Sequence, residues 1–341
     1  MAEPGFDESN WRRRIEEEKP ADLYAPHVKD ARFFNPWMPM PEKGILAFLK
    51  WKFSGRQEYT EEEKNYHPDR IPGAAERIQS TRGDFILWIG HATFLMRIGS
   101  SYWLTDPMLS DRAFIPRRLV SPAMTFRDME IFREVPLNVI ISHNHYDHLD
   151  AETIKSLPPN THFFVPAGLK KFLTDLGQAN VVEMDWWQTV HDGENSVHCL
   201  PAQHWSRRIG QPVNTNLWAS FLIATPGTRI YYGGDTGYFI GFSEFGRKFP
   251  GIDYALIPTT AYRPRWFMHY AHMNVDEALD AFADLKARYF IPTQWGTFRL
   301  GDEPAGFPVV ELKRKIRERN LDASRFLIMD IGQILPIDTK Q

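Results

Sequence analysis

The sequence is poor in three features, and each absence narrows the class of protein. A single cysteine, Cys199, means that no disulfide can form within the chain, which fits a reducing compartment. No apolar run reaches the length of about 18 residues that a transmembrane helix needs, and the charged N-terminus lacks the apolar segment of a signal peptide. Basic residues (40) do not exceed acidic ones (43), so a nucleic-acid partner is not indicated. We expect a cytoplasmic protein, with peripheral contact to a membrane left open.

What the chain does contain is typical of an ordinary globular protein. Hydrophobic residues make up 43% and charged residues 24% of its 341 residues, enough for a core that needs no disulfide. Aromatic residues reach 14%, with 11 tryptophans. Large rings of this kind indicate either a core built from aromatics or a surface that handles apolar ligands.

The pattern of apolar residues changes near residue 80. In residues 1–80 proline and aromatic residues recur, and we expect an irregular extension with a short helix at 44–53 that packs on the main domain. Residues 81–341 alternate short apolar runs with amphipathic helical stretches, one of which begins after the N-cap candidate Asn274. Many strands with several intervening helices predict a mixed α/β (α+β) domain. The order of the elements does not fix how the sheets are arranged.

The segment ISHNHYDHLD carries three histidines and two aspartates directly after an apolar run. His143, His145 and Asp147 point the same way in an extended chain, and a turn after Tyr146 would bring His148 beside them. Imidazole and carboxylate groups suit zinc, manganese or iron. Three of the 12 histidines within six positions would be an improbable coincidence, so the segment predicts a metal site rather than a polar loop.

Further ligands should come from other strand ends, because four ligands from one loop rarely complete a catalytic site. His204 follows the strand-like run SVHCLPA, and Asp235 stands in a glycine-rich turn after RIYY. Alone, such a histidine is more often a structural hydrogen-bonding residue, and such an aspartate usually forms a turn. Together with the preceding cluster, both become candidate ligands.

Taken together, these motifs resemble the metallo-β-lactamase superfamily. Within it, the likeness is to the branch of N-acylphosphatidylethanolamine-hydrolysing phospholipases D, which lies close to the ascorbate-phosphate lactonase-like hydrolases. It extends from about residue 83 to 335 and is carried by WIGHAT (88–93), LTDPMLS (104–110), SHNHYDHLD (142–150), PAQHWSRR (201–208), GGDTGY (233–238), AYRPRWFMHYAH (261–272) and QWGTF (294–298). The resemblance implies an αββα sandwich, in which two packed mixed β-sheets are flanked by helices, with a site for two divalent metals at one edge.

The resemblance also implies which residues bind each metal. Three histidines would hold the first metal, a carboxylate and an imidazole the second, and one aspartate would bridge the two: His143, His145 and His204; Asp147 and His148; and Asp235. We expect two divalent ions, zinc by preference and manganese or iron as alternatives.

The chain departs from the branch at Gln294, where a histidine usually precedes WGTF, and no histidine follows His272. Because an amide oxygen is a poorer zinc ligand than imidazole, the second metal site should be weak, hold a harder metal or keep an additional water. Gln294 is therefore a doubtful metal ligand.

The implied activity is phosphodiester hydrolysis by a hydroxide held between two metals. Asp147 would orient this hydroxide and accept its proton, and His272 would stabilise developing charge or protonate the leaving group. Four further side chains are expected near the metals or the substrate: His91, Tyr146, Tyr262 and Trp266. The implied substrate is N-acylated phosphatidylethanolamine, cut to phosphatidate and an N-acylethanolamine.

Three other interpretations stay open. The same site could serve a lactonase or esterase with a small soluble substrate, or a nuclease, which the net charge of −3 disfavours. Loss of a ligand at Gln294 could instead mark a lipid-binding protein that has lost its activity. The aromatic stretches ARFFNPWMPM and ILAFLKWKF could form a membrane-facing groove or simply pack in the core. A homodimer is expected only by analogy with the fold.

Overall fold

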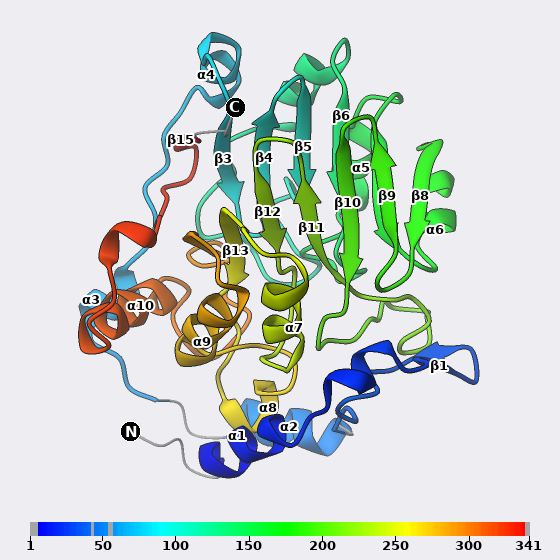
Figure 1. The fold of residues 1–341 in the computed structure, drawn as a ribbon. Helices are drawn as coiled ribbons and strands as arrows, with labels where there is room; N and C mark the ends of the chain where they lie inside the picture. The colour runs from blue at the N-terminus through cyan, green and yellow to red at the C-terminus, as the bar shows by residue number, and fades with distance from the viewer. Residues whose placement is uncertain (1–5, 42–43, 54–56, 338–341) are drawn as a thin grey trace.

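The chain from Phe85 to Pro336 forms two mixed β-sheets that lie face to face (Figure 1). The computed structural model describes residues 6–41, 44–53 and 57–337. The first sheet has the order β15 (Ile334–Pro336), β3 (Phe85–Gly90), β4 (Thr93–Ile98), β5 (Ser101–Thr105), β6 (Leu137–Ile140), β7 (His162–Pro166) and β8 (Asn180–Met184). The second has the order β14 (Tyr289–Thr293), β13 (Tyr254–Pro258), β12 (Arg229–Tyr232), β11 (Ser220–Ala224), β10 (Asn195–Leu200) and β9 (Thr189–Asp192).

Helices flank the pair of sheets. Beside the second sheet lie α7 (Gly241–Lys248), α9 (Val275–Leu285) and α10 (Phe307–Glu318), and beside the first lie α5 (Ala151–Ser156) and α6 (Lys170–Asp175) (Figure 1). The shorter helical elements include α8 (Arg265–Met268), η2 (Phe126–Phe132) and η3 (Ala323–Arg325). Asn274 accepts a hydrogen bond from the backbone of Glu277, so α9 begins where the sequence predicted. The αββα sandwich is thereby confirmed.

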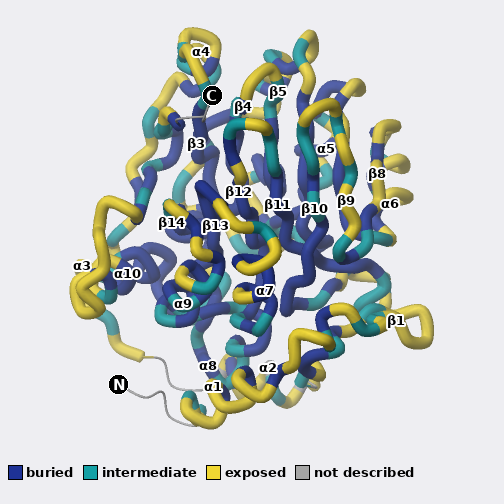
Figure 2. The backbone as a smooth tube through the Cα atoms, in the orientation of Figure 1, coloured by how far each residue is buried: buried dark blue, intermediate teal, exposed yellow. Residues whose placement is uncertain are grey.

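The central strands are buried on both faces. Every residue of β3, β6 and β13 is buried, and Figure 2 shows the tube of β3 and β13 in dark blue. Each sheet has the other sheet on one side and helices on the other, which explains why these strands are continuous apolar runs rather than alternating ones.

Strands of both sheets end at one common edge. In the first sheet β5, β6 and β7 are parallel, and in the second β12, β13 and β14 are parallel. The backbone of Ser142, just after β6, accepts a hydrogen bond from Ala219, just before β11. The side chain of Gln294, after β14, donates to Asp235, after β12. Loops from strands far apart in sequence therefore meet at this edge.

The segment before residue 80 is more helical than its composition indicated. The expected helix is α2 (Ile45–Phe53), and the described residues also contain α1 (Glu8–Glu16), η1 (Pro20–Tyr24), the short pair β1 (Val28–Lys29) and β2 (Arg32–Phe33), α3 (Glu61–Asn65) and α4 (Ala74–Ser80). Asp7 and Thr60 cap α1 and α3 with their side chains. The helices α1, α3 and α4 are short and mostly polar, so they lack the regular spacing of apolar residues by which a helix is usually recognised in a sequence. None of the described helices is long and apolar enough to cross a membrane.

This N-terminal segment packs against the loops of the main domain. The indole nitrogen of Trp11 donates to Glu277 at 2.8 Å, and that of Trp37 donates to Gln203 at 2.9 Å. Trp37 and Met38 are buried, so this part of the aromatic stretch belongs to the core rather than to an open groove. The division of the chain near residue 80 stays a prediction.

Candidate metal centre

The loop after β6 brings its four candidate ligands to the common edge by a tight turn. The backbone nitrogens of His148 and Leu149 donate to the carbonyl of His145 at 3.2 and 2.9 Å. This turn interrupts the extended chain, so Asp147 no longer points with His143 and His145. The four side chains divide into two groups instead.

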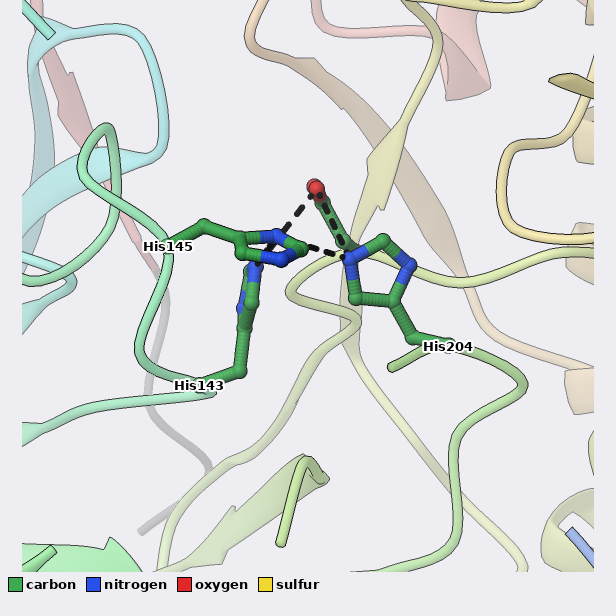
Figure 3. Close-up of side chains that lie close together, drawn as sticks. His143, His145 and His204 are labelled. Carbon is green, nitrogen blue, oxygen red and sulfur yellow. Dashed lines mark hydrogen bonds and ion pairs between the residues drawn. The ribbon is translucent and has the colours of Figure 1, made fainter. Parts of the chain in front are cut away.

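The first cluster consists of His143, His145, His204 and Asp235, whose candidate ligand atoms all lie within 4.8 Å of one another. Nδ1 of His145 lies 2.8 Å from Nε2 of His143 and 3.2 Å from Nε2 of His204. Oδ2 of Asp235 lies 3.7 and 3.5 Å from the same two Nε2 atoms. Figure 3 shows the imidazole rings of His143 and His145, from the loop after β6, and of His204, from another loop, converging on one point.

The second cluster consists of His91, Asp147 and His148, again with ligand atoms within 4.8 Å of one another. Oδ2 of Asp147 lies 3.0 Å from Nε2 of His91 and 3.3 Å from Nε2 of His148. His91 and His148 are fully buried, whereas the side chain of Asp147 keeps 14% exposure. The second cluster therefore opens to solvent through its carboxylate.

Asp235 touches both clusters. Its Oδ2 faces the first, and its Oδ1 lies 3.2 Å from Nε2 of His148 in the second. Gly234 allows Asp235 to lie between the two clusters. Its φ of +58° is left-handed, which glycine adopts readily, and a Cβ at this position would come within 2.5 Å of Ser142 Cβ. The glycine-rich turn brings β12 close to the end of β6, and Asp235 occupies the position expected of a bridging ligand.

Hydrogen bonds to Nδ1 orient three of these rings. Nδ1 of His143 lies 2.9 Å from Ser142 Oγ, and that of His204 lies 3.2 Å from the carbonyl of Ala271. Nδ1 of His148 lies 2.6 Å from Oδ2 of Asp106. In each case Nε2 is left facing the clusters, as metal-binding histidines require.

Asp106 and Ser142 contact the candidate ligands, and the sequence alone did not single them out. The Asp106 carboxylate also accepts hydrogen bonds from the backbone and hydroxyl of Ser142 and from the hydroxyl of Tyr232. The available signal was a lone aspartate after the strand-like run SYWLT, followed by proline. Trp205, whose ring centroid lies 4.5 Å from that of His145, was missed as well.

Burial keeps the histidines of the first cluster neutral. It lowers the pKa of His143 and His204 well below the ordinary value, and it lowers the pKa of His145 to about 4. Neutral imidazole is the form that binds a metal, so these three rings need lose no proton before they bind one.

The charges of the second cluster are coupled. Burial opposes the ionisation of Asp147 and Asp235, yet the neighbouring charge and hydrogen bonds of His148 hold the pKa of both carboxyls well below the usual range. Burial likewise opposes protonation of His148, but Asp235, Asp147 and Asp106 raise its pKa well above the ordinary value. His148 therefore carries a proton that a cation would displace.

The donor set and its spacing fit divalent metals. Zinc bonds of about 2.0–2.1 Å place tetrahedral ligand atoms about 3.3–3.4 Å apart. The measured separations in the two clusters run from 2.8 to 3.7 Å around that value. Imidazole and carboxylate together suit zinc, manganese or iron.

The remaining predicted residues differ in how near they lie to the clusters. The ring centroid of His272 is 5.3 Å from that of His204. Tyr146 follows His145 directly and accepts a hydrogen bond from the backbone of Ile209. Tyr262 is 1% exposed and its hydroxyl donates to Glu311 at 2.6 Å, which places it in the core.

Trp266 contacts the N-terminal segment. Its ring lies 4.8 Å from Nζ of Lys50 in α2 and 5.5 Å from the ring of Phe267. A role for Trp266 in contacting the substrate stays a prediction.

Gln294 is held by its amide nitrogen. Nε2 donates to Oδ1 of Asp235 at 2.7 Å and to the carbonyl of Gly234 at 3.1 Å. Since both partners are acceptors, the NH₂ group rather than the oxygen faces Asp235. Gln294 thus contacts a candidate ligand without presenting its own oxygen beside it.

Comparisons with known proteins show which family the chain is similar to. A family model described as a beta-lactamase superfamily domain matches residues 103–295. N-acyl-phosphatidylethanolamine-hydrolyzing phospholipase D 1 of Caenorhabditis elegans is 34% identical over 283 residues, which cover 76% of this chain and 78% of that protein. The mitochondrial N-acyl-phosphatidylethanolamine-hydrolyzing phospholipase D of Saccharomyces cerevisiae is 34% identical over 248 residues, which cover 68% of this chain and 52% of that protein.

A solved structure shares the fold. The metallo hydrolase Igni18 of the archaeon Ignicoccus hospitalis superimposes with a TM-score of 0.57 at 20% identity, covering 75% of this chain and 99% of that one. At this level of identity the likeness extends to the fold and no further.

Proposed function

Because this chain belongs to the β-lactamase superfamily and is a metal-dependent hydrolase, we propose that it is a zinc-dependent phosphodiesterase of phospholipase D type that acts on N-acylphosphatidylethanolamine-like lipids. The observation that carries the proposal is the pair of clusters that share Asp235 at one edge of the sandwich. The activity for which two relatives, each 34% identical, are named supports the substrate class.

Divalent ions at such a site supply an acidified water for attack and positive charge for the phosphate oxygens. The residues of the chain position the reaction. His143, His145 and His204 would hold one ion, Asp147 and His148 the other, and Asp235 would contact both. Asp147, the partly exposed carboxylate of the second cluster, is placed to orient the attacking water and accept its proton.

His272 is the candidate for the proton donor to the leaving group. Its ring lies against His204, on the side of the first cluster. The backbone fixes its place, since its nitrogen donates to the carbonyl of Met268 at 3.1 Å and its carbonyl accepts from Arg265 at 3.2 Å. A fixed histidine beside the metals suits proton delivery to a departing alkoxide.

Exposed apolar side chains beside the clusters support a lipid substrate. Phe114 stacks on Tyr146 with ring centroids 4.8 Å apart, and the backbone of Ile209 donates to the hydroxyl of the same tyrosine. Ile115 and Ile209 are each 71% exposed. Apolar tips of this kind can enter a membrane surface, so we include peripheral membrane contact in the proposal.

The test compares substrates at a fixed zinc load. Purified protein with measured metal content is assayed on N-acylphosphatidylethanolamine in mixed micelles, on a soluble phosphodiester and on a lactone. Release of phosphatidate and an N-acylethanolamine with the highest kcat/KM supports the proposal. Turnover of the lactone alone would replace the phosphodiesterase with an esterase, and turnover of none would favour a binding protein.

Membrane contact has its own test. The variants Ile115→Glu and Ile209→Glu should lower co-sedimentation with phospholipid vesicles, while Leu321→Glu, an exposed leucine after α10, should leave it unchanged. Equal co-sedimentation of all three variants would remove these side chains from the proposal. The homodimer and the cytoplasmic location stay predictions.

A further inference from the structure

The second cluster contains a histidine beyond the two ligands that the sequence assigned to it. His91 lies in the turn between β3 and β4, more than 50 residues before the motif, and its Nε2 lies 3.0 Å from Oδ2 of Asp147. Its ring meets that of His148 edge-on, with centroids 5.3 Å apart. Asp147 and His148 thus face a third group of ligand type.

Gln294 does not take this third place. Its amide nitrogen is used by Asp235 and Gly234, as described above, and this leaves its oxygen turned away from Asp235. A metal beside Asp147 and His148, which Asp235 would also contact, would therefore need its remaining protein ligand from elsewhere, or would keep only water there.

The conformation and the hydrogen bonds of the His91 backbone fix the position of its ring. Its φ of +54° is left-handed, an uncommon conformation for a residue other than glycine. The backbone nitrogen donates to Thr297 Oγ1 at 2.9 Å, and the carbonyl accepts from the indole of Trp88 at 2.9 Å. A residue kept in a strained conformation by several fixed contacts is a frequent sign of a functional position.

The same carbonyl ties His91 to Gln294. The backbone nitrogen of Gln294, itself left-handed with a φ of +72°, donates to the carbonyl of His91 at 3.1 Å. The loop after β3, which carries the imidazole of His91, and the loop after β14, which carries the amide of Gln294, are thus linked at the common edge of the two sheets.

We propose that His91, and not Gln294, completes the protein ligands of the metal held by Asp147, His148 and the shared Asp235, and that Gln294 acts by hydrogen-bonding Asp235. This assignment deepens the proposed function, because it rests on the same metal centre. It concerns only which atoms hold the metal, so it can fail or succeed whatever the substrate is.

The first test needs no variant. Crystals of the zinc-loaded protein are measured at the zinc absorption edge, so that anomalous density locates the ions. The expected distance from the ion beside His148 to Nε2 of His91 is about 2.0–2.1 Å. A distance above about 3 Å, or no ion beside His148, would overturn the assignment and make His91 a positioning residue for Asp147.

The second test counts metals in solution by plasma mass spectrometry after dialysis. His91→Gln should reduce two ions per chain to one, while Gln294→Ala should keep two. The double variant H91Q/Q294H should recover the second ion, because it returns one imidazole to the cluster from the other loop. Loss of the second ion in Gln294→Ala with its retention in His91→Gln would reverse the two roles and overturn the proposal.

The matched control is His162→Gln. His162 is exposed at the start of β7, opposite the start of β6 in the register and so away from the metal edge. It should keep two ions. Thermal unfolding of every variant with chelator present separates loss of a ligand from loss of the fold.

If two ions are bound with His91 as a ligand and no lipid is hydrolysed, only the proposed substrate fails. If the lipid is hydrolysed while His91 stays unbound, only the ligand assignment fails.

Discussion

The two clusters of the metal edge are built on different principles. The first is dominated by histidines that burial keeps neutral, two of them fixed through Nδ1 by Ser142 and Ala271. The second places a carboxylate between two imidazoles and carries a proton on His148. The first is therefore ready to bind a cation, whereas the second must exchange a proton for one. The difference teaches that one edge of the sandwich can combine a cluster that is ready to bind a cation with a cluster in which a cation must first displace a proton.

The largest effect is expected where the two clusters meet. Asp235→Asn replaces the carboxylate that touches both, so both ions should weaken and turnover should fall at least about 1000-fold, equivalent to about 4 kcal/mol in activation free energy. Metal content and kcat/KM measure this directly. Retention of two tightly bound ions would show that Asp235 does not bridge the clusters.

The next variant separates the clusters. His204→Gln removes one imidazole from the first cluster and should weaken the first ion more than about 100-fold, since loss of a ligand should exceed the 10–100-fold that is typical for an outer hydrogen-bond partner. The second ion should change little. Competition with a chromophoric chelator gives both affinities, and an equal loss at both sites would contradict the division into two clusters.

A third variant acts on the second cluster through Asp106, which faces Nδ1 of His148 rather than Nε2. Asp106→Asn removes the anionic acceptor of His148 Nδ1–H, so the second ion should weaken roughly 10–100-fold. The first ion should weaken less, because Asp106 reaches His143 only through Ser142. Unchanged affinity at the second site would mean that Asp106 serves the fold alone.

The smallest effect is expected from a change of a single pH unit. The raised pKa of His148 means that the second ion displaces a proton, so its affinity should fall about tenfold for each unit by which pH decreases. The lowered pKa of His143, His145 and His204 predicts a nearly flat response of the first ion above pH 6. Parallel slopes for the two ions, measured by chelator competition between pH 6 and 8, would contradict the comparison.

Much of the site could be predicted from the sequence because its ligands lie in short, dense motifs at strand ends. The HxHxDH pattern needs only local spacing to indicate a metal, and an apolar run before it indicates where the strand ends. Alternation in an extended chain correctly placed His143 with His145. It failed for Asp147, because the backbone of His148 and Leu149 turns back to His145 and sends that carboxylate to the other cluster.

The sequence by itself determined the mixed α/β class and indicated a metal-binding edge with most of its candidate ligands, and the resemblance of its motifs to the superfamily implied the αββα arrangement. Only the tertiary structure decided that His91 lies against Asp147, that Asp106 orients His148 and that Gln294 turns its nitrogen to Asp235. These contacts join residues 42 to 59 positions apart. A local repeat in the sequence cannot predict such pairings. They depend on which parallel strands of the two sheets end at the same edge, and on the left-handed turns that orient each side chain.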